Sequence, residues 1–262
     1  MKNEGIHSII QLFPVTLGAI PLSGRIIGGE QTKIGVAFYR LSLRYGGDHI
    51  CGASLISATR ALTAAQCRIP TSPLHKYTVM VGSRFLHGGR SSKISMIYAW
   101  IAHPSHVPNS NNYDIAVLWL EEEFPLGPAI SYIRRPDQDE PVPTGELATV
   151  SGWGATVEPQ NPNGVPFTFA DNLHSTQVKI LPNNECNPMM RARDDGRVTD
   201  QIICTGSSQS GVCNGDEGGP LVIDGVLVGI VSATGGCTRP DFLTTYTRVS
   251  SYADWINSVL TE

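Results

Sequence analysis

The chain has 262 residues, of which 41% are apolar without glycine, and this amount of apolar side chain excludes intrinsic disorder as its main character. Charged residues make up only 16%, while 27 glycines and 18 prolines favour short strands and turns over long charged helices. The net charge of −4 is too small to indicate nucleic acid as a partner.

Residues 1–25 have some features of a secretion signal followed by a short pro-segment. The apolar stretch 9–20 is interrupted by Gln11, Pro14 and Thr16, and it is too short to span a bilayer, which takes about 20 apolar residues. We therefore expect a leader at 1–25 and a secreted, extracellular protein.

After residue 25, short runs rich in β-branched and aromatic residues alternate with clusters of Gly, Pro, Asn and Ser. This pattern predicts an all-β barrel or sandwich. Ser250–Leu260 is the single segment with helical periodicity, and Ser250 is its candidate N-cap. The predicted strands are Val36–Leu43, Ala53–Ile56, Tyr77–Val81, Ile94–Ile101, Ile115–Leu120, Leu147–Val150, Gln177–Ile180 and Leu221–Val231.

Charge is distributed unevenly along these elements. Between His49 and Tyr113 there is no Asp or Glu, so with six cations there and −4 overall, the rest of the chain carries −10. The cations form a candidate anion-binding face if the fold gathers them, and a scattered, solvated set if it does not. They are Arg60, Arg68, Lys76, Arg84, Arg90 and Lys93.

Seven short motifs occur in order along the chain. They are Arg25-Ile26-Ile27-Gly28-Gly29, Cys51-Gly52-Ala53-Ser54-Leu55-Ile56, Leu62-Thr63-Ala64-Ala65-Gln66-Cys67, Asn112-Tyr113-Asp114-Ile115-Ala116, Ser151-Gly152-Trp153-Gly154, Gly215-Asp216-Glu217-Gly218-Gly219-Pro220, and Tyr246-Thr247-Arg248-Val249 followed by Trp255-Ile256. Together they resemble the trypsin/chymotrypsin family of serine proteases. The resemblance implies two six-stranded antiparallel β-barrels, about 26–140 and 141–262, with a cleft between them and a C-terminal α-helix.

At the three catalytic positions of that family, this sequence keeps only the carboxylate. Serine-protease chemistry needs a hydroxyl nucleophile, an imidazole base and a carboxylate that orients the base. Asp114 is the carboxylate, but Gln66 stands at the base position and its amide cannot accept a proton near neutral pH. Glu217 stands at the nucleophile position. We therefore expect no hydrolysis by the family mechanism.

Glu217 and Asp114 also raise the possibility of paired carboxylates, as in glycosidases or aspartic proteases. We expect instead a structural chain Asp114–Gln66–Glu217, with Gly215 and Glu217 as the remnant of the oxyanion hole. By resemblance, the specificity pocket has Gly211 as its floor and Thr234 and Thr244 as its walls. Such a pocket favours small apolar side chains.

The resemblance also implies an activation cleavage after Arg25, which frees Ile26 to pair with Asp216. We hypothesise that this cleavage switches the conformation of the 211–219 loop, and with it partner binding. The alternative is a relic sequence without consequence.

The six cysteines are an even number, as in a disulfide framework, but their count alone fixes no connectivity. By resemblance they form the pairs Cys51–Cys67, Cys186–Cys204 and Cys213–Cys237, which implies an oxidising compartment. We expect no zinc site, because there is no C-x-x-C motif, and no calcium, because the expected loop lies in the acid-free stretch. The seven histidines are scattered and predict no ligand set.

The sequence thus predicts a secreted, non-catalytic serine protease homologue without cofactors. It would act by binding a protein partner as a cofactor, decoy or regulator in an extracellular proteolytic or immune cascade. Two alternatives stay open: an active trypsin-like endopeptidase, and a binder of an anionic glycan or small ligand.

Overall fold

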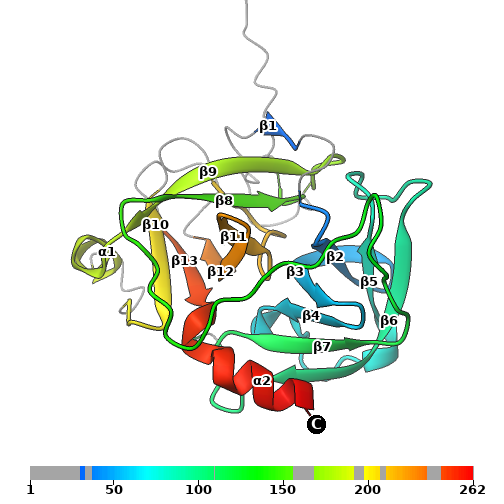
Figure 1. Cartoon of the computed structure of the whole chain (residues 1–262), viewed down its shortest axis with the longest axis horizontal. Coiled ribbons are helices and arrows are strands. Elements are labelled where there is room, and N and C mark those ends of the chain that lie inside the picture. The colour runs from blue at the N-terminus through cyan, green and yellow to red at the C-terminus, as the bar shows by residue number, and fades with distance from the viewer. Residues whose placement is uncertain are drawn as a thin grey trace, which may run out of the picture.

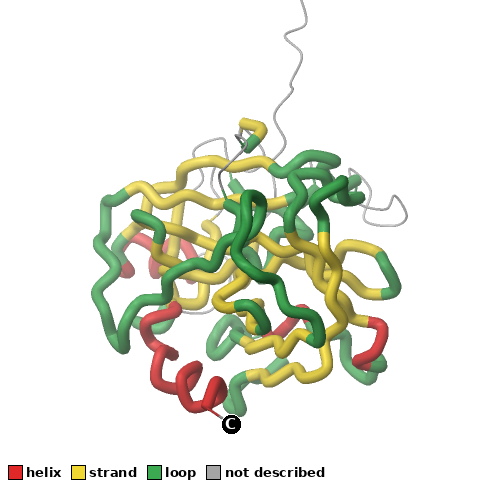
Figure 2. The backbone as a smooth tube through the Cα atoms, turned by 45° about the vertical axis from the view of Figure 1, so that its right-hand side comes forward, coloured by secondary structure: helices red, strands yellow, loops and turns green. Residues whose placement is uncertain are grey.

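A computed structural model of the chain describes residues 30–32, 37–108, 110–155, 168–191, 198–206, 211–234 and 243–261. Its strands form two groups, which lie side by side in Figures 1 and 2, with a C-terminal helix below. Both groups are antiparallel and closed, so the predicted fold class is confirmed.

The first group is a closed barrel with the strand order β2-β3-β4-β7-β6-β5. Closure comes from the pairing of β2 with β5, in which Leu43 lies opposite Val79. Inward side chains such as Leu41, Leu55 and Val117 are fully buried and fill the barrel. Its strands are β2 (Arg40–Tyr45), β3 (Asp48–Ser57), β4 (Arg60–Thr63), β5 (Tyr77–Val81), β6 (Lys93–Ala102) and β7 (Ala116–Leu120).

The second group has the order β9-β10-β13-β12-β11-β8, and pairing of β8 with β9 closes it. A two-residue strand, β1 (Glu30–Gln31), adds to the outer edge of β9. The six barrel strands are β8 (Leu147–Gly152), β9 (His174–Leu181), β10 (Ile202–Gly206), β11 (Pro220–Ile223), β12 (Val226–Thr234) and β13 (Leu243–Arg248).

The chain crosses between the two barrels near both of its described ends. Strand β1 belongs to the second barrel, although it precedes the first in sequence. At the other end, Val249, Tyr252 and Ile256 join the buried cluster of the first barrel, and α2 (Ala253–Thr261) lies beneath β7 (Figure 1). The predicted division near residue 140 falls between β7 and β8.

The C-terminal helix is present but begins later than its sequence predicts. A 3₁₀ turn, η3 (Val249–Tyr252), precedes α2, so Ser250 is not the N-cap. Its hydroxyl instead accepts a hydrogen bond from Arg248 Nε (2.9 Å). Two further 3₁₀ turns are η1 (Ala65–Cys67) and η2 (Leu74–Lys76).

The structure corrects three local predictions. The single strand Leu221–Val231 is a hairpin, because Asp224 and Gly225 both have positive φ (47° and 77°) and turn the chain between β11 and β12. Strands β1, β4, β10 and β13 were not among the strands predicted from the local pattern. Helix α1 (Asn183–Arg191) was also missed because Pro188 and its asparagines are poor helix formers.

Candidate functional site

Gln66 and Asp114 are joined by two hydrogen bonds. The backbone N–H of Gln66, in η1, donates to Asp114 Oδ1 (2.9 Å), and its side-chain Nε2 donates to Oδ2 (2.6 Å). Asp114 is fully buried just before β7, and burial raises its pKa while these hydrogen bonds oppose the rise. The glutamine side chain therefore acts here as a donor to the carboxylate.

Ser232, on β12 of the second barrel, completes this contact. Its hydroxyl donates to Asp114 Oδ2 (2.6 Å), and its carbonyl accepts a hydrogen bond from Gln66 Nε2. Both N–H groups of the Gln66 side chain are thus engaged. Ser232 was not among the predicted site residues, although it is a polar residue inside the apolar run of β12.

The carboxylate of Glu217 turns back on its own loop. Its Oε2 accepts a hydrogen bond from the backbone N–H of Gly215 (2.6 Å). In the described parts of the chain no hydrogen bond joins Glu217 to Gln66, so the predicted chain Asp114–Gln66–Glu217 is wrong in its second link. The reason is local, because the Gln66 donors are already used and Gly215 lies only two residues away.

The environment of Glu217 disfavours its charged form. Burial raises the pKa of Glu217 to about 7, and the nearby carboxylates of Asp216 and Asp114 act in the same direction. The backbone N–H groups of Glu217 and Gly215 oppose the rise. Near neutral pH both the protonated and the ionised form of Glu217 are therefore populated.

Gly215 is held from its other side by a buried histidine. Its carbonyl faces His49 Nε2 (2.9 Å), while His49 Nδ1 faces the hydroxyl of Ser42 (2.9 Å). A carbonyl can only accept, so Nε2 carries the proton and Nδ1 accepts from Ser42. Burial lowers the pKa of His49 to about 3, so the ring is neutral. His49 was not a predicted site residue, because nothing in the local sequence sets it apart from the other histidines.

Asp216 is fully buried and lies opposite a buried arginine. Its Oδ1 and Oδ2 accept hydrogen bonds from the N–H groups of Gly154 (2.8 Å) and Cys213 (3.0 Å). Arg40 Nη2 lies 4.0 Å from Oδ1, and both side chains are 0% exposed. The carboxylate thus has an internal cation beside it. Arg40 was not a predicted site residue, although it is the charged residue of the predicted strand Val36–Leu43.

Glycines make the room for this ion pair. A Cβ on Gly52 or Gly219 would lie only 2.2 or 2.0 Å from Arg40 Nη1. A Cβ on Gly152 would lie 1.8 Å from Asp216 Oδ1. These three glycines belong to three of the sequence motifs, so the motifs meet around the Arg40–Asp216 pair.

Comparison with known proteins identifies the family. The model of the family described as Trypsin matches residues 26–256. The chain belongs to the trypsin family. Trypsin 5G1 of Aedes aegypti is 34% identical over 245 residues, covering 92% of this chain and 87% of the relative. Kallikrein-8 of Homo sapiens is 32% identical over 244 residues, covering 90% and 86%.

Two solved structures resemble this trypsin-family chain. One is neuropsin, a serine protease expressed in the limbic system of mouse brain, with a TM-score of 0.77 and 29% identity over 88% of this chain and 98% of that chain. The other is human heparin binding protein, with a TM-score of 0.76 and 28% identity over 90% and 97%.

The disulfides agree with the family resemblance where the structure describes them. Cys51–Cys67 and Cys186–Cys204 are bonded, as predicted. Cys213 is also disulfide-bonded, while its predicted partner Cys237 lies outside the described residues. The first bond fixes η1, and hence Gln66, to β3.

The remaining predicted site residues are described only in part. Thr234 and Thr244 are cross-strand partners of β12 and β13. Gly211 is described, but residues 207–210 and 235–242 around the predicted pocket are not. Arg25 and Ile26 also lie outside the described residues, so the cleavage hypothesis stays a prediction.

The six cations of the acid-free stretch form no ion pair within the described part of the chain. Four instead lie over aromatic rings close to them, among them Lys76, whose Nζ is 5.8 Å from the ring centroid of Tyr45. Arg60 Cζ is 3.5 Å from the Trp119 ring centroid, Arg68 Cζ is 4.7 Å from that of Tyr77, and Arg84 Cζ is 4.9 Å from that of Phe85.

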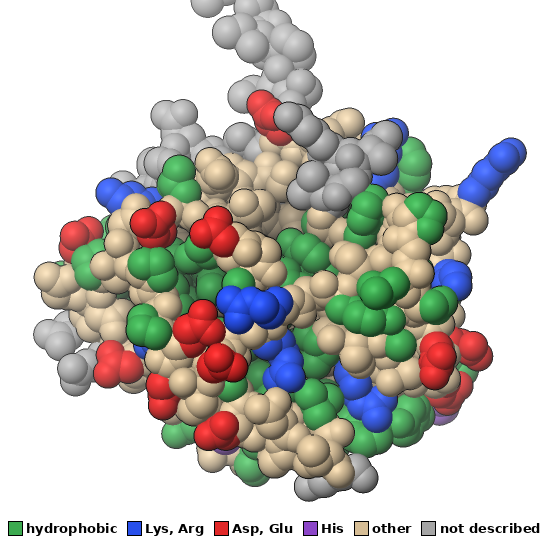
Figure 3. Space-filling model, viewed as in Figure 1, with side chains coloured by type: hydrophobic (Ala, Val, Ile, Leu, Met, Phe, Trp, Pro, Cys, Tyr) green, Lys and Arg blue, Asp and Glu red, His purple; other side chains and the backbone are tan. Residues whose placement is uncertain are grey.

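Hydrophobic side chains are exposed on the side of β5 and β6 (Figures 1 and 3). They include Ile94, Met96 and Tyr98 of β6, which are 55%, 38% and 48% exposed. Lys93, one of the six cations, is the first residue of β6 and directly precedes Ile94 in the chain.

Over the described residues, no group of three or more His, Cys, Asp or Glu side chains is placed to hold a metal ion. Nor does any described helix have the length and hydropathy needed to cross a membrane.

Proposed function

We propose that this trypsin-family protein does not hydrolyse peptide bonds by the family mechanism, and that it acts by binding a protein partner outside the cell. The observation that carries the proposal is the hydrogen bond from Gly215 N–H to Glu217 Oε2. Acyl transfer needs backbone N–H donors free to stabilise a developing oxyanion. The carboxylate uses one of these donors and stands where a hydroxyl nucleophile is required.

The position of Gln66 supports the same proposal. A general base must take a proton from the nucleophile, and an amide is too weak a base to do so near neutral pH. The two side-chain N–H groups of Gln66 instead donate to Asp114 and to Ser232. Loss of one triad member in a working protease costs about 10⁴ to 10⁶ in turnover. Binding, as a cofactor, decoy or regulator of a proteolytic or immune cascade, is the function that remains.

An active-site fluorophosphonate probe tests the absence of catalysis. The protein is cleaved after Arg25 and incubated with the probe, and we expect no labelled serine. The matched control is the variant Gln66→His/Glu217→Ser, in which Asp114 is retained and labelling at position 217 is expected. Labelling of the unmodified chain would establish the active trypsin-like endopeptidase, the alternative that the proteases among its relatives favour.

A second candidate function is binding of an anionic polysaccharide. The six cations without ion-pair partners and the likeness to a structure named heparin binding protein favour it. Retention on a heparin column at physiological salt would support this function, and elution at low salt would oppose it.

Extracellular localisation is part of the same proposal. Two described disulfides fit an oxidising compartment, and the relatives belong to a family of typically secreted proteins. A reporter fused to residues 1–25 and assayed for export tests the proposed leader.

A further inference from the structure

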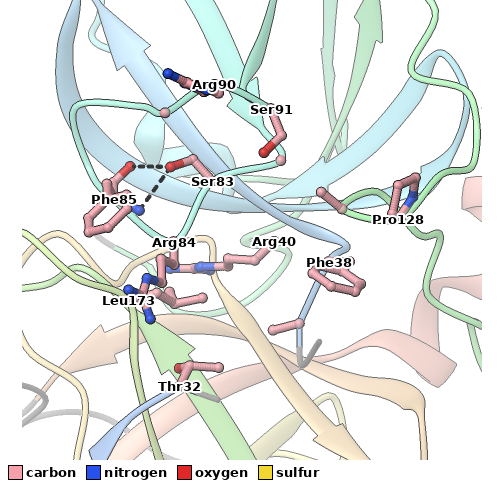
Figure 4. A pocket seen from close by; sticks show the side chains of 14 residues that line it. Thr32, Phe38, Arg40, Ser83, Arg84, Phe85, Arg90, Ser91, Pro128 and Leu173 are labelled. Atoms are coloured by element: carbon pink, nitrogen blue, oxygen red, sulfur yellow. Dashed lines mark hydrogen bonds between the residues drawn. The ribbon is translucent and has the colours of Figure 1, made fainter. Parts of the chain in front are cut away.

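A cavity of about 430 Å³ opens between the two barrels, and none of Gln66, Asp114 and Glu217 lines it. Its volume is in the range of small-molecule sites, about 300–1,000 Å³. We name it the arginine pocket. As Figure 4 shows, its lining includes Thr32, Phe38, Arg40, Arg84, Phe85 and Arg90.

The lining is cationic. Arg40, Arg84 and Arg90 line the pocket, and no Asp or Glu stands among the described lining residues. Asp171, close in sequence to the lining residue Leu173, instead faces His87 at 3.8 Å. Arg84 and Arg90 are exposed at the surface, whereas Arg40 is buried. The pocket therefore combines two accessible cations with one cation in its wall.

Two buried polar side chains in the lining have no hydrogen-bond partner among the residues that the structure describes. The Thr32 hydroxyl is one, on a residue that is 5% exposed, and the guanidinium nitrogens of Arg40 are the other. Buried polar groups in folded proteins are nearly always satisfied. The Arg40 guanidinium has no accessible surface and lies 4.0 Å from Asp216 Oδ1, so it adds positive charge to the wall of the pocket and does not contact a ligand directly.

The walls are apolar and fixed in place. Phe38, Phe85 and Leu173 line the pocket beside the arginines. The Arg84 carbonyl accepts hydrogen bonds from Trp153 Nε1 (2.9 Å) and from Leu173 N–H (2.7 Å), which holds the loop after β5 against the second barrel. Ser83 Oγ in turn accepts from the Phe85 N–H (2.9 Å), drawn as a dashed line in Figure 4.

We propose that the arginine pocket binds a small organic acid, with its carboxylate attracted by the positive charges of Arg84 and Arg90 and its aromatic or aliphatic body against Phe38, Phe85 and Leu173. A carboxylate suits the planar guanidinium fork, which can bind both of its oxygens. The apolar walls distinguish such a ligand from an inorganic anion. The site does not depend on whether the protein is catalytic.

Isothermal titration calorimetry with 4-phenylbutyrate tests the proposal on the full chain. We expect 4-phenylbutyrate to bind, and the neutral 4-phenylbutanamide and sulfate each to bind at least tenfold more weakly than 4-phenylbutyrate. The variant Arg84→Gln/Arg90→Gln should also bind phenylbutyrate at least tenfold more weakly. The matched control, Arg60→Gln/Lys93→Gln, removes the same charge outside the pocket and should bind as the unmodified protein does.

Three results would overturn the proposal. They are equal affinity for the amide, equal affinity for sulfate, and an equal loss of affinity in the control variant. Arg84 and Arg90 are exposed, so we expect the variant to fold as the unmodified protein does. Thermal unfolding of each variant checks this. A positive fluorophosphonate test would refute the proposed function and leave this proposal standing.

Discussion

Replacement of Asp216 by Asn should strongly destabilise the protein. The change removes the carboxylate that lies 4.0 Å from Arg40 Nη2, with both side chains fully buried. At that distance, and with an effective dielectric constant of about 20, the two charges interact by about 4 kcal/mol. We therefore expect Asp216→Asn to lower the free energy of unfolding by about 3–5 kcal/mol, the usual cost of leaving a buried charge without its partner.

Replacement of Arg40 should lower the free energy of unfolding by less than replacement of Asp216 does. After Arg40→Met, the Asp216 carboxylate keeps its hydrogen bonds from Gly154 and Cys213, and burial already raises its pKa, so it can take up a proton. The double variant Arg40→Met/Asp216→Asn should then be more stable than the sum of the two single losses predicts.

Urea denaturation of the four proteins, followed by tryptophan fluorescence, measures this coupling. If the losses of the single variants add to within about 0.5 kcal/mol, the two side chains do not interact, and the reasoning from their separation is refuted. Hydrogen exchange of the 211–219 loop in the same variants, before and after cleavage at Arg25, also tests the cleavage hypothesis. Unchanged protection on cleavage would refute the hypothesis that cleavage switches the conformation of this loop.

Three other changes give measurable outcomes. The pKa of Glu217 is about 7 in the folded protein against 4.5 for an unperturbed Glu side chain, so the folded state binds the proton more tightly. This contribution to stability is fully present below pH 4.5 and is lost as the pH rises through 7. The difference in unfolding free energy between the unmodified protein and Glu217→Gln should thus fall by about 3 kcal/mol over that range, and a flat difference would contradict it. The pKa of His49 is lowered in the folded protein, so the unfolded state binds the proton more tightly and stability should fall as the pH is lowered from 6.5 toward 3. His49→Gln should make the free energy of unfolding depend less on pH over this range. Gly219→Ala should lower the free energy of unfolding by about 1–3 kcal/mol, because its Cβ would crowd Arg40. Gly127→Ala, whose Cβ meets nothing closer than 3.9 Å, should lower it little, and urea denaturation measures both variants.

Much of the fold was predictable because strands of this protein carry their own local signals. Tyr77–Val81 was predicted with its observed bounds, since its β-branched and aromatic run is isolated by turn residues. The strand β4 was missed because its four residues are too few to show alternation. The hairpin turn at Asp224-Gly225 lay inside an apolar run, and only its positive φ values reveal two strands there.

The candidate site was predictable in its residue types and less so in its contacts. The sequence placed Gln66, Asp114 and Glu217 at one site because the motifs around them resemble family segments. It did not find Ser232, His49 or Arg40, because the role of each depends on contacts with residues far away in sequence.

The sequence by itself determined the all-β class and the family resemblance, because these follow from residue identity and local pattern, and through that resemblance it predicts that a hydroxyl and an imidazole are missing at the catalytic positions. Only the tertiary structure decided how the hydrogen bonds are shared. The donors of Gln66 go to Asp114 and Ser232, and the carboxylate of Glu217 takes Gly215 N–H. A buried donor or acceptor takes whichever partner packing brings within about 3 Å, and residues from both barrels compete for that place.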